Sequence, residues 1–267
     1  MGAPILTVDS LARDLRVLGL RTGDGVFVHA SMRAIGPVIG GARSVIEALQ
    51  QVLGRDGLIG MPGFSGDASF PPHLDRAAMS EREIAEAERA VPGFDRRRSA
   101  TLGMGVIAET FRTWPGTERS DHPNVSICLN GRGAAELTAS HSRAWATGPD
   151  TPLGRLCDRP ATKILLIGVD WTRCTALHTA EARARHRRTK LRRFKSGPND
   201  ADWVETHDVA DDLGRLFPAV GAAFEAAGRV HRGRVGAAEC RLCDLAELVG
   251  FAAEEIDAAN RASGDLH

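Results

Sequence analysis

The sequence has few cysteines, no long apolar run and no excess of either charge. Its five cysteines do not make a disulfide framework in 267 residues, so we expect a reducing, cytoplasmic setting. No apolar run approaches the ~18 to 20 residues that cross a bilayer, and the N-terminus lacks a basic-then-apolar signal pattern. Because 34 basic and 34 acidic side chains balance, no global field recruits nucleic acid or a membrane, and a charged ligand must meet a local cluster.

What remains is an ordinary globular composition, with 43% hydrophobic and 25% charged residues. The N-terminal pattern predicts an amphipathic helix over 6–20, capped by Asp9 or Ser10, and then a βαβ unit with a right-handed crossover. This unit consists of a strand, a glycine-rich loop, a helix and a second strand, over Gly25–Ala30, Ser31–Gly41, Ala42–Leu53 and Leu58–Met61.

Between Pro62 and Arg98 the periodicity weakens, and we expect only one polar helix, over Ser80–Ala90. A long irregular excursion in a compact domain is more often a lid or a binding loop than filler. The later segments predict helices over Gly105–Trp114, Ala134–Ser140, Leu213–Ala227 and Cys243–Ala262, and strands over Val125–Leu129, Lys163–Asp170 and Trp203–His207. We therefore predict one α/β domain over 1–267, with a central mixed sheet flanked by helices and an irregular insertion, about 62–98, over the active-site cleft.

A histidine and a glutamate follow the strand predicted at 163–170. Thr175 is a candidate N-cap for the next helix, which places His178 and Glu181 on one helix face. The carboxyl end of a buried strand is where open α/β sheets carry their chemistry. The carboxylate can fix the tautomer of the ring and raise its basicity, as a general base requires. An ion pair on a helix surface explains the same spacing.

Three loops of small residues are candidate ligand contacts. The Ser31–Gly41 loop opens onto a helix N-terminus, where free N–H groups and the helix dipole favour a phosphate, and Ser31 or Arg33 could add donors. The loop matches neither the dinucleotide fingerprint nor the P-loop. Thr101–Gly105 repeats the pattern, and Arg119–Pro123 is a basic loop with a hydroxyl group. Ordinary turn chemistry accounts for each of them as well.

The cysteines suggest two further hypotheses. Cys174, four residues before His178, is a possible acyl-transfer nucleophile, although only that histidine is in place to lower the pKa of its thiol. Cys240 and Cys243 lack the second pair that a zinc site needs, so we expect structural cysteines on a helix.

Two other polar clusters suggest weaker hypotheses, a metal site and a nucleic-acid-binding surface. The spacing of His178, Glu181 and His186 matches no metal motif, and we predict no metal. The basic run 183–195 could bind RNA or DNA. It lacks interleaved aromatic residues apart from Phe194, and a solvated helix face is the better interpretation of its charges.

In several of these segments the chain resembles the aminoglycoside 3-N-acetyltransferases. The matching blocks keep the family's order from about residue 25 to 185 and are specific only together. They are His29-Ala30-Ser31 with Gly36 and Gly40-Gly41-Ala42, Met61-Pro62 with Ser65-Gly66, Thr101 with Met104–Glu109 and Arg112–Gly116, Arg119-Ser120 with His122-Pro123, Thr151-Pro152-Leu153, and Leu165–Asp170 with Thr175–His178 and Ala180-Glu181. Phe70 stands where many family members have an acidic residue, and Cys174 stands where an asparagine is common. These two differences concern the choice of aminoglycoside more than the reaction.

The resemblance implies acetyl transfer from acetyl-CoA to the 3-amino group of the 2-deoxystreptamine ring of an aminoglycoside, and so antibiotic resistance. It implies His178 as the base and Glu181 as its partner. It places along coenzyme A the loop residues Ser31, Arg33, Gly36, Val38, Gly40, Gly41, Thr101, Met104 and Ser120. A polycationic drug needs carboxylates, for which the candidates are Asp67, Asp170 and, more weakly, Glu205.

We expect direct transfer in a ternary complex, with a loop N–H or the hydroxyl of Thr175 or Thr179 facing the developing oxyanion. The alternatives are an acyl-Cys174 intermediate, another amine substrate, a drug- or CoA-binding protein without catalysis, and a nucleic-acid binder that uses 183–195. The sequence leaves the oligomeric state and the drug spectrum open.

Overall fold

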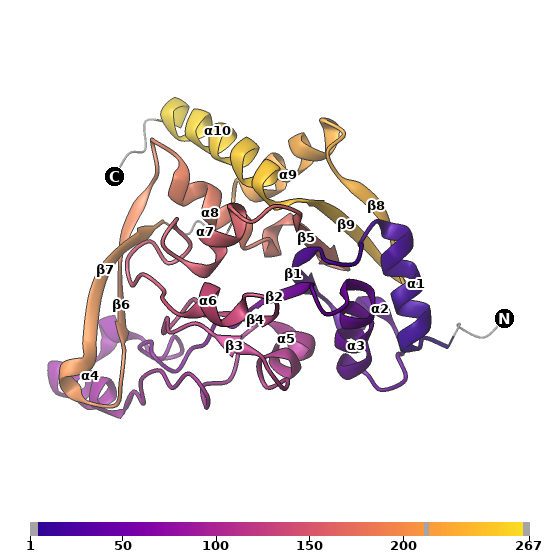
Figure 1. Ribbon diagram of the computed structural model, residues 1–267. Coiled ribbons are helices and arrows are strands. Elements are labelled where there is room, and N and C mark those ends of the chain that lie inside the picture. The colour runs from indigo at the N-terminus through magenta and orange to yellow at the C-terminus, as the bar shows by residue number, and fades with distance from the viewer. Residues whose placement is uncertain (1–4, 211–213, 264–267) are drawn as a thin grey trace.

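A seven-stranded mixed sheet organises the computed structural model, which describes residues 5–210 and 214–263 (Figure 1). The strand order is β3-β4-β2-β1-β5-β9-β8. The central strand β1 (Gly25–Ala30) is parallel to β2 (Leu58–Pro62) and to β5 (Thr162–Ile167). The remaining strands run antiparallel to their neighbours: β3 (Glu118–Arg119), β4 (Ile127–Gly131), β8 (His231–Val235) and β9 (Ala238–Asp244). The predicted α/β fold with a central mixed sheet is confirmed.

The two faces of the sheet bury separate apolar cores, because successive side chains of a strand point to opposite faces. In β1, Val26 and Val28 join one core and Phe27 the other. The first core is closed by α1 (Val8–Leu18), α2 (Met32–Ile35), α3 (Ala42–Leu53) and α5 (Gly105–Arg112). The second is closed by α6 (Ala134–Thr138), α7 (Pro152–Cys157), α8 (Ala176–Arg183), α9 (Phe217–Ala226) and α10 (Leu245–Ser263).

The predicted N-terminal βαβ unit is present, with β1 and α3 at the predicted residues and β1 paired in parallel with β2. Two details were wrong. The first helix is capped by Thr7, whose side chain accepts the N–H of Ser10, so neither Asp9 nor Ser10 is the cap. Part of the predicted Ser31–Gly41 loop is the short helix α2, because Ser31 caps it by accepting the N–H of Ala34.

Two predictions for the second half of the chain are corrected. The basic run 183–195 does not continue a helix: α8 ends at Arg183, and β6 (Thr189–Lys195) pairs antiparallel with β7 (Trp203–Val209). Cys240 and Cys243 lie on β9, which adds to the edge of β5, and not on a helix. In both cases strand pairing with a distant segment overrides the local pattern. The expected helix start at Leu213 lies outside the described residues, and α9 begins at Phe217.

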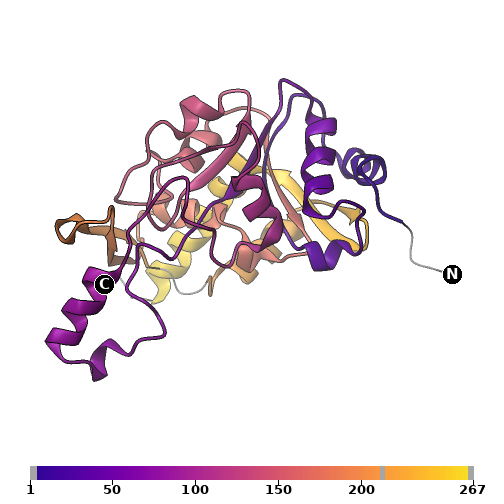
Figure 2. The same ribbon diagram turned by 90° about the horizontal axis from the view of Figure 1, so that it is seen from below.

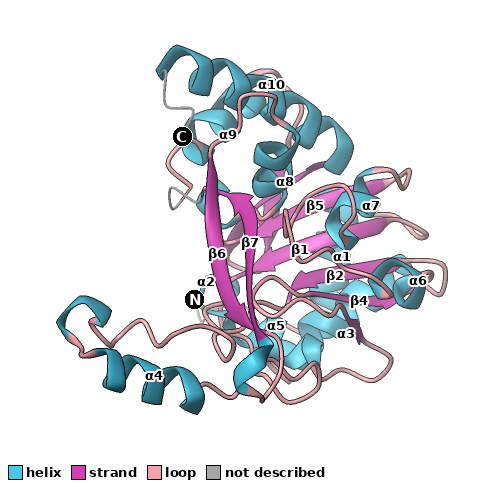
Figure 3. Cartoon of the chain, turned by 90° about the vertical axis from the view of Figure 1, so that its left-hand side faces the viewer, coloured by secondary structure: helices cyan, strands magenta, loops and turns pink. Residues whose placement is uncertain are grey.

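The irregular insertion and the β6–β7 hairpin form an arm outside the main sheet. Figure 3 shows the hairpin beside α4 (Glu81–Ala90), and Figure 2 shows the purple segment that contains α4 extending from the body. The Lys195 side chain is fully buried, and its Nζ donates to the carbonyls of Arg89 and Val91, 3.2 and 2.9 Å away, at the C-terminal end of α4. Arg193 forms an ion pair with Glu88 of the same helix. The two segments of the arm are therefore tied together by charge.

The remaining predicted helices and strands are present in order with shifted ends, whereas β3, α7 and β8 were not predicted. The strand predicted at Val125–Leu129 begins at Ile127, and the helix predicted at Gly105–Trp114 ends at Arg112. No helix within the described ranges is long and apolar enough to cross a membrane. The prediction of a single domain over 1–267 stays a prediction.

Candidate active site

A cleft of about 780 Å³ opens where the parallel strands β1, β2 and β5 end. The last residues of β1 and β2 and the segments that follow the strands form its walls, together with the first turn of α5 and the segment that leads into α8. The lining comprises Val28–Arg33, Met61, Pro62, Phe64, Gly103–Ala108, Val169, Thr172–Thr175, His178 and Gly214. This is the edge of the sheet at which α/β proteins place ligands and chemistry.

The charge of this cleft is positive. Two exposed arginines, Arg33 and Arg173, belong to its lining, and no aspartate or glutamate does among the described residues. The first turn of α5 adds backbone N–H groups, because no side chain caps this helix. Gly103 and Gly105 take positive φ angles of 72° and 84° in the turn that brings the chain into α5. The cleft is therefore suited to an anionic ligand.

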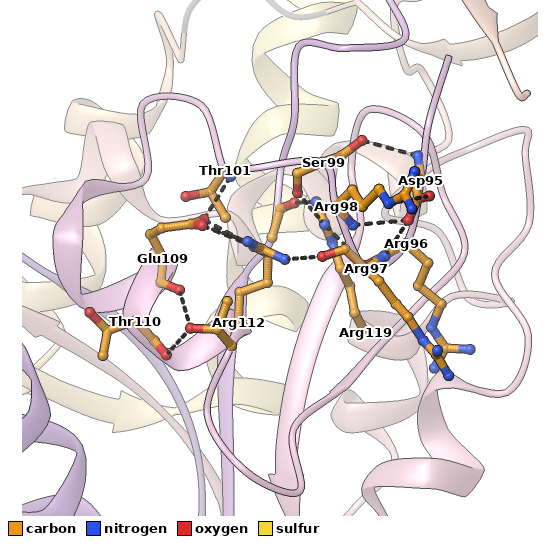
Figure 4. Close-up of polar contacts among 12 residues, drawn as sticks. Asp95, Arg96, Arg97, Arg98, Ser99, Thr101, Glu109, Thr110, Arg112 and Arg119 are labelled. Carbon is orange, nitrogen blue, oxygen red and sulfur yellow. Dashed lines mark hydrogen bonds and ion pairs between the residues drawn. The ribbon is translucent and has the colours of Figure 1, made fainter. Parts of the chain in front are cut away.

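A network of charged groups holds the turn before α5 (Figure 4). The N–H of Thr101 donates to Glu109 Oε2 at 2.8 Å, and Arg112 Nη2 donates to Glu109 Oε1 at 2.6 Å. Arg112 Nη1 also donates to the carbonyl of Arg97 at 2.7 Å, which ties the insertion to α5. Burial would raise the pKa of Glu109, but the hydrogen bonds from Arg112 and Thr101 lower it to about 2. Glu109 therefore remains an anion that fixes this wall of the cleft.

His178 and Glu181 are brought together as the spacing predicted. His178 Nδ1 lies 2.6 Å from Glu181 Oε2, and the two side chains are 23% and 14% exposed. The Phe217 ring meets the imidazole edge to face, with centroids 4.8 Å apart. Since a carboxylate only accepts, the hydrogen bond assigns the proton to Nδ1 and leaves the lone pair on Nε2. The ring is thus prepared to accept a proton at Nε2.

His29 and Cys174 lie beside this pair in the cleft lining. The N–H of Thr175 donates to His29 Nε2 at 3.2 Å, which links the end of β1 to the start of α8. Burial, with a smaller effect from His178, lowers the pKa of His29 to about 3, so its ring is neutral. Burial raises the pKa of the Cys174 thiol to about 12. His29 belongs to a block that resembles the family, but no role for it was predicted from the sequence.

A second cavity of about 260 Å³ adjoins the cleft, and the two share Phe64, Met104 and His178. The rest of its lining comes from the insertion, from loops and from the β6–β7 hairpin: Ser65, Leu102, Asn124, Val125, Ala146, Thr147, Arg192, Asp208 and Val209. Arg192 Nε donates to Asp208 Oδ2 at 2.7 Å. His178 therefore stands between a positively charged cleft and a smaller cavity that holds a paired arginine and aspartate.

Only some of the predicted cofactor contacts lie in the cleft lining. Ser31, Arg33 and Met104 do. The residues that the structure does not bring to it are Gly36, Val38, Gly40, Gly41, Thr101 and Ser120. The Ser120 hydroxyl is fully buried, donates to His141 Nδ1 at 2.8 Å and accepts the N–H of Ile127 at 2.8 Å, so both of its hydrogen bonds are internal.

None of the three predicted substrate carboxylates lines either cavity. Asp67 is exposed, Asp170 accepts the N–H of Thr172 at the start of a short 3₁₀ turn, and Glu205 lies 3.8 Å from Arg193 Nε on the hairpin. The carboxylate that does line a cavity is Asp208. Asp208 lies within β7, which continues to Val209, and its nearness to the strand predicted at 203–207 does not by itself mark it as a site residue.

Of the two hydroxyl groups predicted from the sequence as oxyanion donors, only one belongs to a residue that lines the cleft. Thr175 lines the cleft, whereas the Thr179 hydroxyl is fully buried away from both cavities. Over the described ranges, no group of three histidine, cysteine, aspartate or glutamate side chains is arranged to hold a metal ion.

Comparisons of this chain with known protein families and sequences all point to the same family. A sequence profile described as aminoglycoside 3-N-acetyltransferase matches residues 27–257. The SPbeta prophage-derived aminoglycoside N(3')-acetyltransferase-like protein YokD of Bacillus subtilis is 35% identical, over 92% of this chain and 90% of its own length. Aminoglycoside N(3)-acetyltransferase IX of Micromonospora chalcea is 34% identical, over 96% of this chain and 95% of its own length.

Solved structures give the same result. AAC-IIIb in a binary complex with CoASH superposes with a TM-score of 0.84 at 29% identity, covering 96% of this chain and 98% of its own. AAC-VIa with bound sisomicin superposes with a TM-score of 0.83 at 33% identity, covering 96% and 99% of the two chains.

Proposed function

The chain belongs to the aminoglycoside 3-N-acetyltransferase family, and we propose that it transfers the acetyl group of acetyl-CoA directly to an amine, with His178 as the general base. The acceptor that the family indicates is the 3-amino group of the 2-deoxystreptamine ring of an aminoglycoside. The observation that supports this proposal is the position of His178, which lines both the large cleft and the second cavity.

Coenzyme A fits the large cleft on grounds of charge and shape. Its phosphates would meet Arg33, Arg173 and the uncapped start of α5. Val106, which is 55% exposed, provides apolar surface for the pantetheine chain. The CoASH held by the related AAC-IIIb supports this assignment. The thioester would then lie at the His178 end of the cleft, and the amine would approach from the second cavity.

The proposed reaction needs one base and one oxyanion donor. The amine nitrogen attacks the thioester carbonyl carbon, and His178 Nε2 takes the proton that the nitrogen loses. Glu181 stabilises the resulting imidazolium through Nδ1–H. The carbon–sulfur bond then breaks, and the thiolate receives the proton from the imidazolium to give free CoA and an amide. Thr175 lines the cleft, and its hydroxyl is the candidate donor to the oxyanion.

The state of Cys174 argues against an acyl-enzyme. An acyl-transfer cysteine reacts as the thiolate, whereas burial raises the pKa of the fully buried Cys174 thiol to about 12. A negligible fraction is ionised at neutral pH. Direct transfer requires no such intermediate.

The experiment is to measure free-thiol release from acetyl-CoA with a panel of aminoglycosides, for the wild type and for His178→Ala. We expect the rate to fall by ~10²- to 10⁴-fold, with CoA binding by calorimetry retained. His186→Ala is the matched control, because His186 also pairs with a carboxylate, Asp257 at 3.0 Å, but lines neither cavity. Equal rates for His178→Ala and the wild type would refute the proposal.

A further inference from the structure

His29 lines the cleft but has no part in the reaction described so far. It is the last residue but one of β1, and the end of this strand forms part of the cleft wall. Successive side chains of a strand alternate between the faces of the sheet, so His29 points to the same face as Phe27, and the two rings meet edge to face with centroids 5.4 Å apart. This is the face that α8 covers. The His29 ring therefore lies on the His178 side of the sheet.

One hydrogen bond fixes which nitrogen of the His29 ring carries the proton. The backbone N–H of Thr175 donates to Nε2 at 3.2 Å, so Nε2 must hold the lone pair. A neutral imidazole has one N–H, which is then at Nδ1. Because burial lowers the pKa of the ring to about 3, the ring stays neutral at neutral pH. His29 is therefore a lasting N–H donor and not a base.

The Nδ1–H group of His29 has no partner inside the protein. Within the described part of the chain no side chain or carbonyl accepts from it, and Nδ1 is not among the fully buried nitrogens and oxygens that lack a partner. Solvent therefore reaches Nδ1, although the residue is only 7% exposed. Of the two cavities, His29 borders only the cleft. The donor thus faces the space in which acetyl-CoA would lie.

His29 also lies beside the residues that the proposed reaction uses. Its partner Thr175 carries the hydroxyl that is the candidate donor to the oxyanion, and the charge of a protonated His178 lowers the pKa of His29. His178 becomes an imidazolium when it takes the proton of the amine. A second histidine that charged as well would repel this imidazolium. A neutral ring does not, and a neutral histidine can polarise a carbonyl group.

We propose that His29 is a second catalytic histidine, whose Nδ1–H donates a hydrogen bond to the carbonyl oxygen of the acetyl thioester. The proposal rests on the acetyl transfer proposed above and adds a donor to that of Thr175. When the amine nitrogen attacks the carbonyl carbon, the π electrons move to the oxygen, and Nδ1–H stabilises this charge without giving up its proton. As the carbon–sulfur bond breaks, the electrons return to the carbonyl, and the proton held by His178 goes to the sulfur.

Two substitutions separate this donor from the hydrogen bond that holds the ring. A glutamine amide can place its oxygen where Nε2 of histidine lies, and an asparagine amide can place its nitrogen where Nδ1 lies. His29→Gln therefore keeps an acceptor for the N–H of Thr175 and loses the donor in the cleft, whereas His29→Asn does the reverse. We expect His29→Gln to lower kcat by about 10²- to 10³-fold, as the loss of one oxyanion donor does, and His29→Asn to retain kcat within about tenfold.

The assay is steady-state release of free thiol from acetyl-CoA with sisomicin, or with whichever aminoglycoside of the panel supports the fastest release. The KM values for both substrates should change by less than about threefold, because the lost interaction is made in the transition state.

His141→Gln is the matched control for this assay. His141 is also a buried ring whose pKa burial lowers, to about 3, but it lines neither cavity. Its Nε2–H donates to the carbonyl of Ala146 at 2.8 Å, and a glutamine amide can reproduce this bond. The control should therefore keep the wild-type kcat.

Heteronuclear NMR of the wild-type protein with isotope-labelled histidine tests the same donor without a substitution. We expect His29 to be the neutral Nδ1–H tautomer, and we expect its Nδ1 signal to move when acetyl-CoA is added without an acceptor. An Nε2–H tautomer, or an Nδ1 signal that acetyl-CoA leaves unchanged, would overturn the proposal even if the variants do not fold.

The outcomes separate this proposal from the one on which it rests. If release of CoA requires His178 but His29→Gln keeps the wild-type kcat, or if His29→Asn loses as much activity as His29→Gln, His29 is not the donor and the acetyl transfer stands. If no release that depends on His178 is seen, both proposals fail.

Discussion

Mild acid is expected to destabilise this protein strongly, through three histidines that are buried in the neutral form. Burial lowers the pKa of His29 to about 3, of His122 to about 4 and of His141 to about 3. Each neutral ring also accepts a hydrogen bond that a protonated ring cannot: His29 from the N–H of Thr175, His122 from the N–H of Val125, and His141 from a serine hydroxyl. Protonation therefore requires each ring to leave its site.

The magnitude follows from the difference in proton binding. A histidine in the unfolded chain has a pKa near 6.5, so below that pH the unfolded state binds more protons than the folded state. The stability from these histidines is complete above about pH 6.5 and is lost as the pH falls toward their folded pKa values. At about pH 5 each contributes a loss of about 2 kcal/mol, and the three together about 6 kcal/mol. Total stabilities are roughly 5–15 kcal/mol.

Urea unfolding followed by tryptophan fluorescence would measure this loss. The four tryptophans provide the signal, and a comparison of about pH 7.5 with pH 5 avoids most of the titration of Glu109, whose pKa of about 2 matters only in stronger acid. His122→Gln and His141→Gln should each reduce the pH dependence by about 2 kcal/mol. Equal free energies of unfolding at the two pH values, or an undiminished pH dependence in both variants, would refute the reasoning.

Three further predictions concern the site and the arm. Glu181→Gln should lower kcat by about 10²-fold or more, because the amide cannot stabilise the imidazolium through Nδ1–H, and should leave the KM for acetyl-CoA unchanged in steady-state assays. Cys174→Ala should retain activity, and mass spectrometry after incubation with acetyl-CoA alone should show no acetyl group on the wild-type thiol; an inert variant would contradict direct transfer. Lys195→Met should lose the ammonium that binds the carbonyls at the end of α4, with a cost of about 1–3 kcal/mol, and should speed hydrogen exchange in α4; unchanged exchange would show that Lys195 does not anchor the arm.

The sequence predicted those parts of the protein in which local pattern and fold agree. The strand at Gly25–Ala30 and the helix at Ala42–Leu53 have strong periodicity and clear glycine boundaries, and both appear at the predicted residues. The spacing of His178 and Glu181 correctly predicted that their side chains lie together, and they form a hydrogen bond, because residues three apart on a helix are neighbours on its surface. These features depend on a few neighbouring residues.

The rest depends on contacts between distant segments. Nothing within the basic run at 183–195 reveals that part of it pairs with β7, because its charges alone favour a solvated helix face. The contact between Arg192 and Asp208 follows from the register of that hairpin, which the sequence does not reveal, whereas exposed acids such as Asp67 stand out in the sequence. Ser120 has the right residue type for a ligand contact, but its hydroxyl is satisfied inside the protein.

The measurement that most directly tests the role of His178 is the pH dependence of single-turnover acetyl transfer, with enzyme preloaded with acetyl-CoA, for the wild type and His178→Gln. We predict that at neutral pH the variant is slower by ~10²- to 10⁴-fold, and that it recovers as the pH approaches the pKa of the amine, where free amine no longer needs a base. A variant that matches the wild type at neutral pH, or that does not recover in alkali while CoA binding is intact, would contradict His178 as the base.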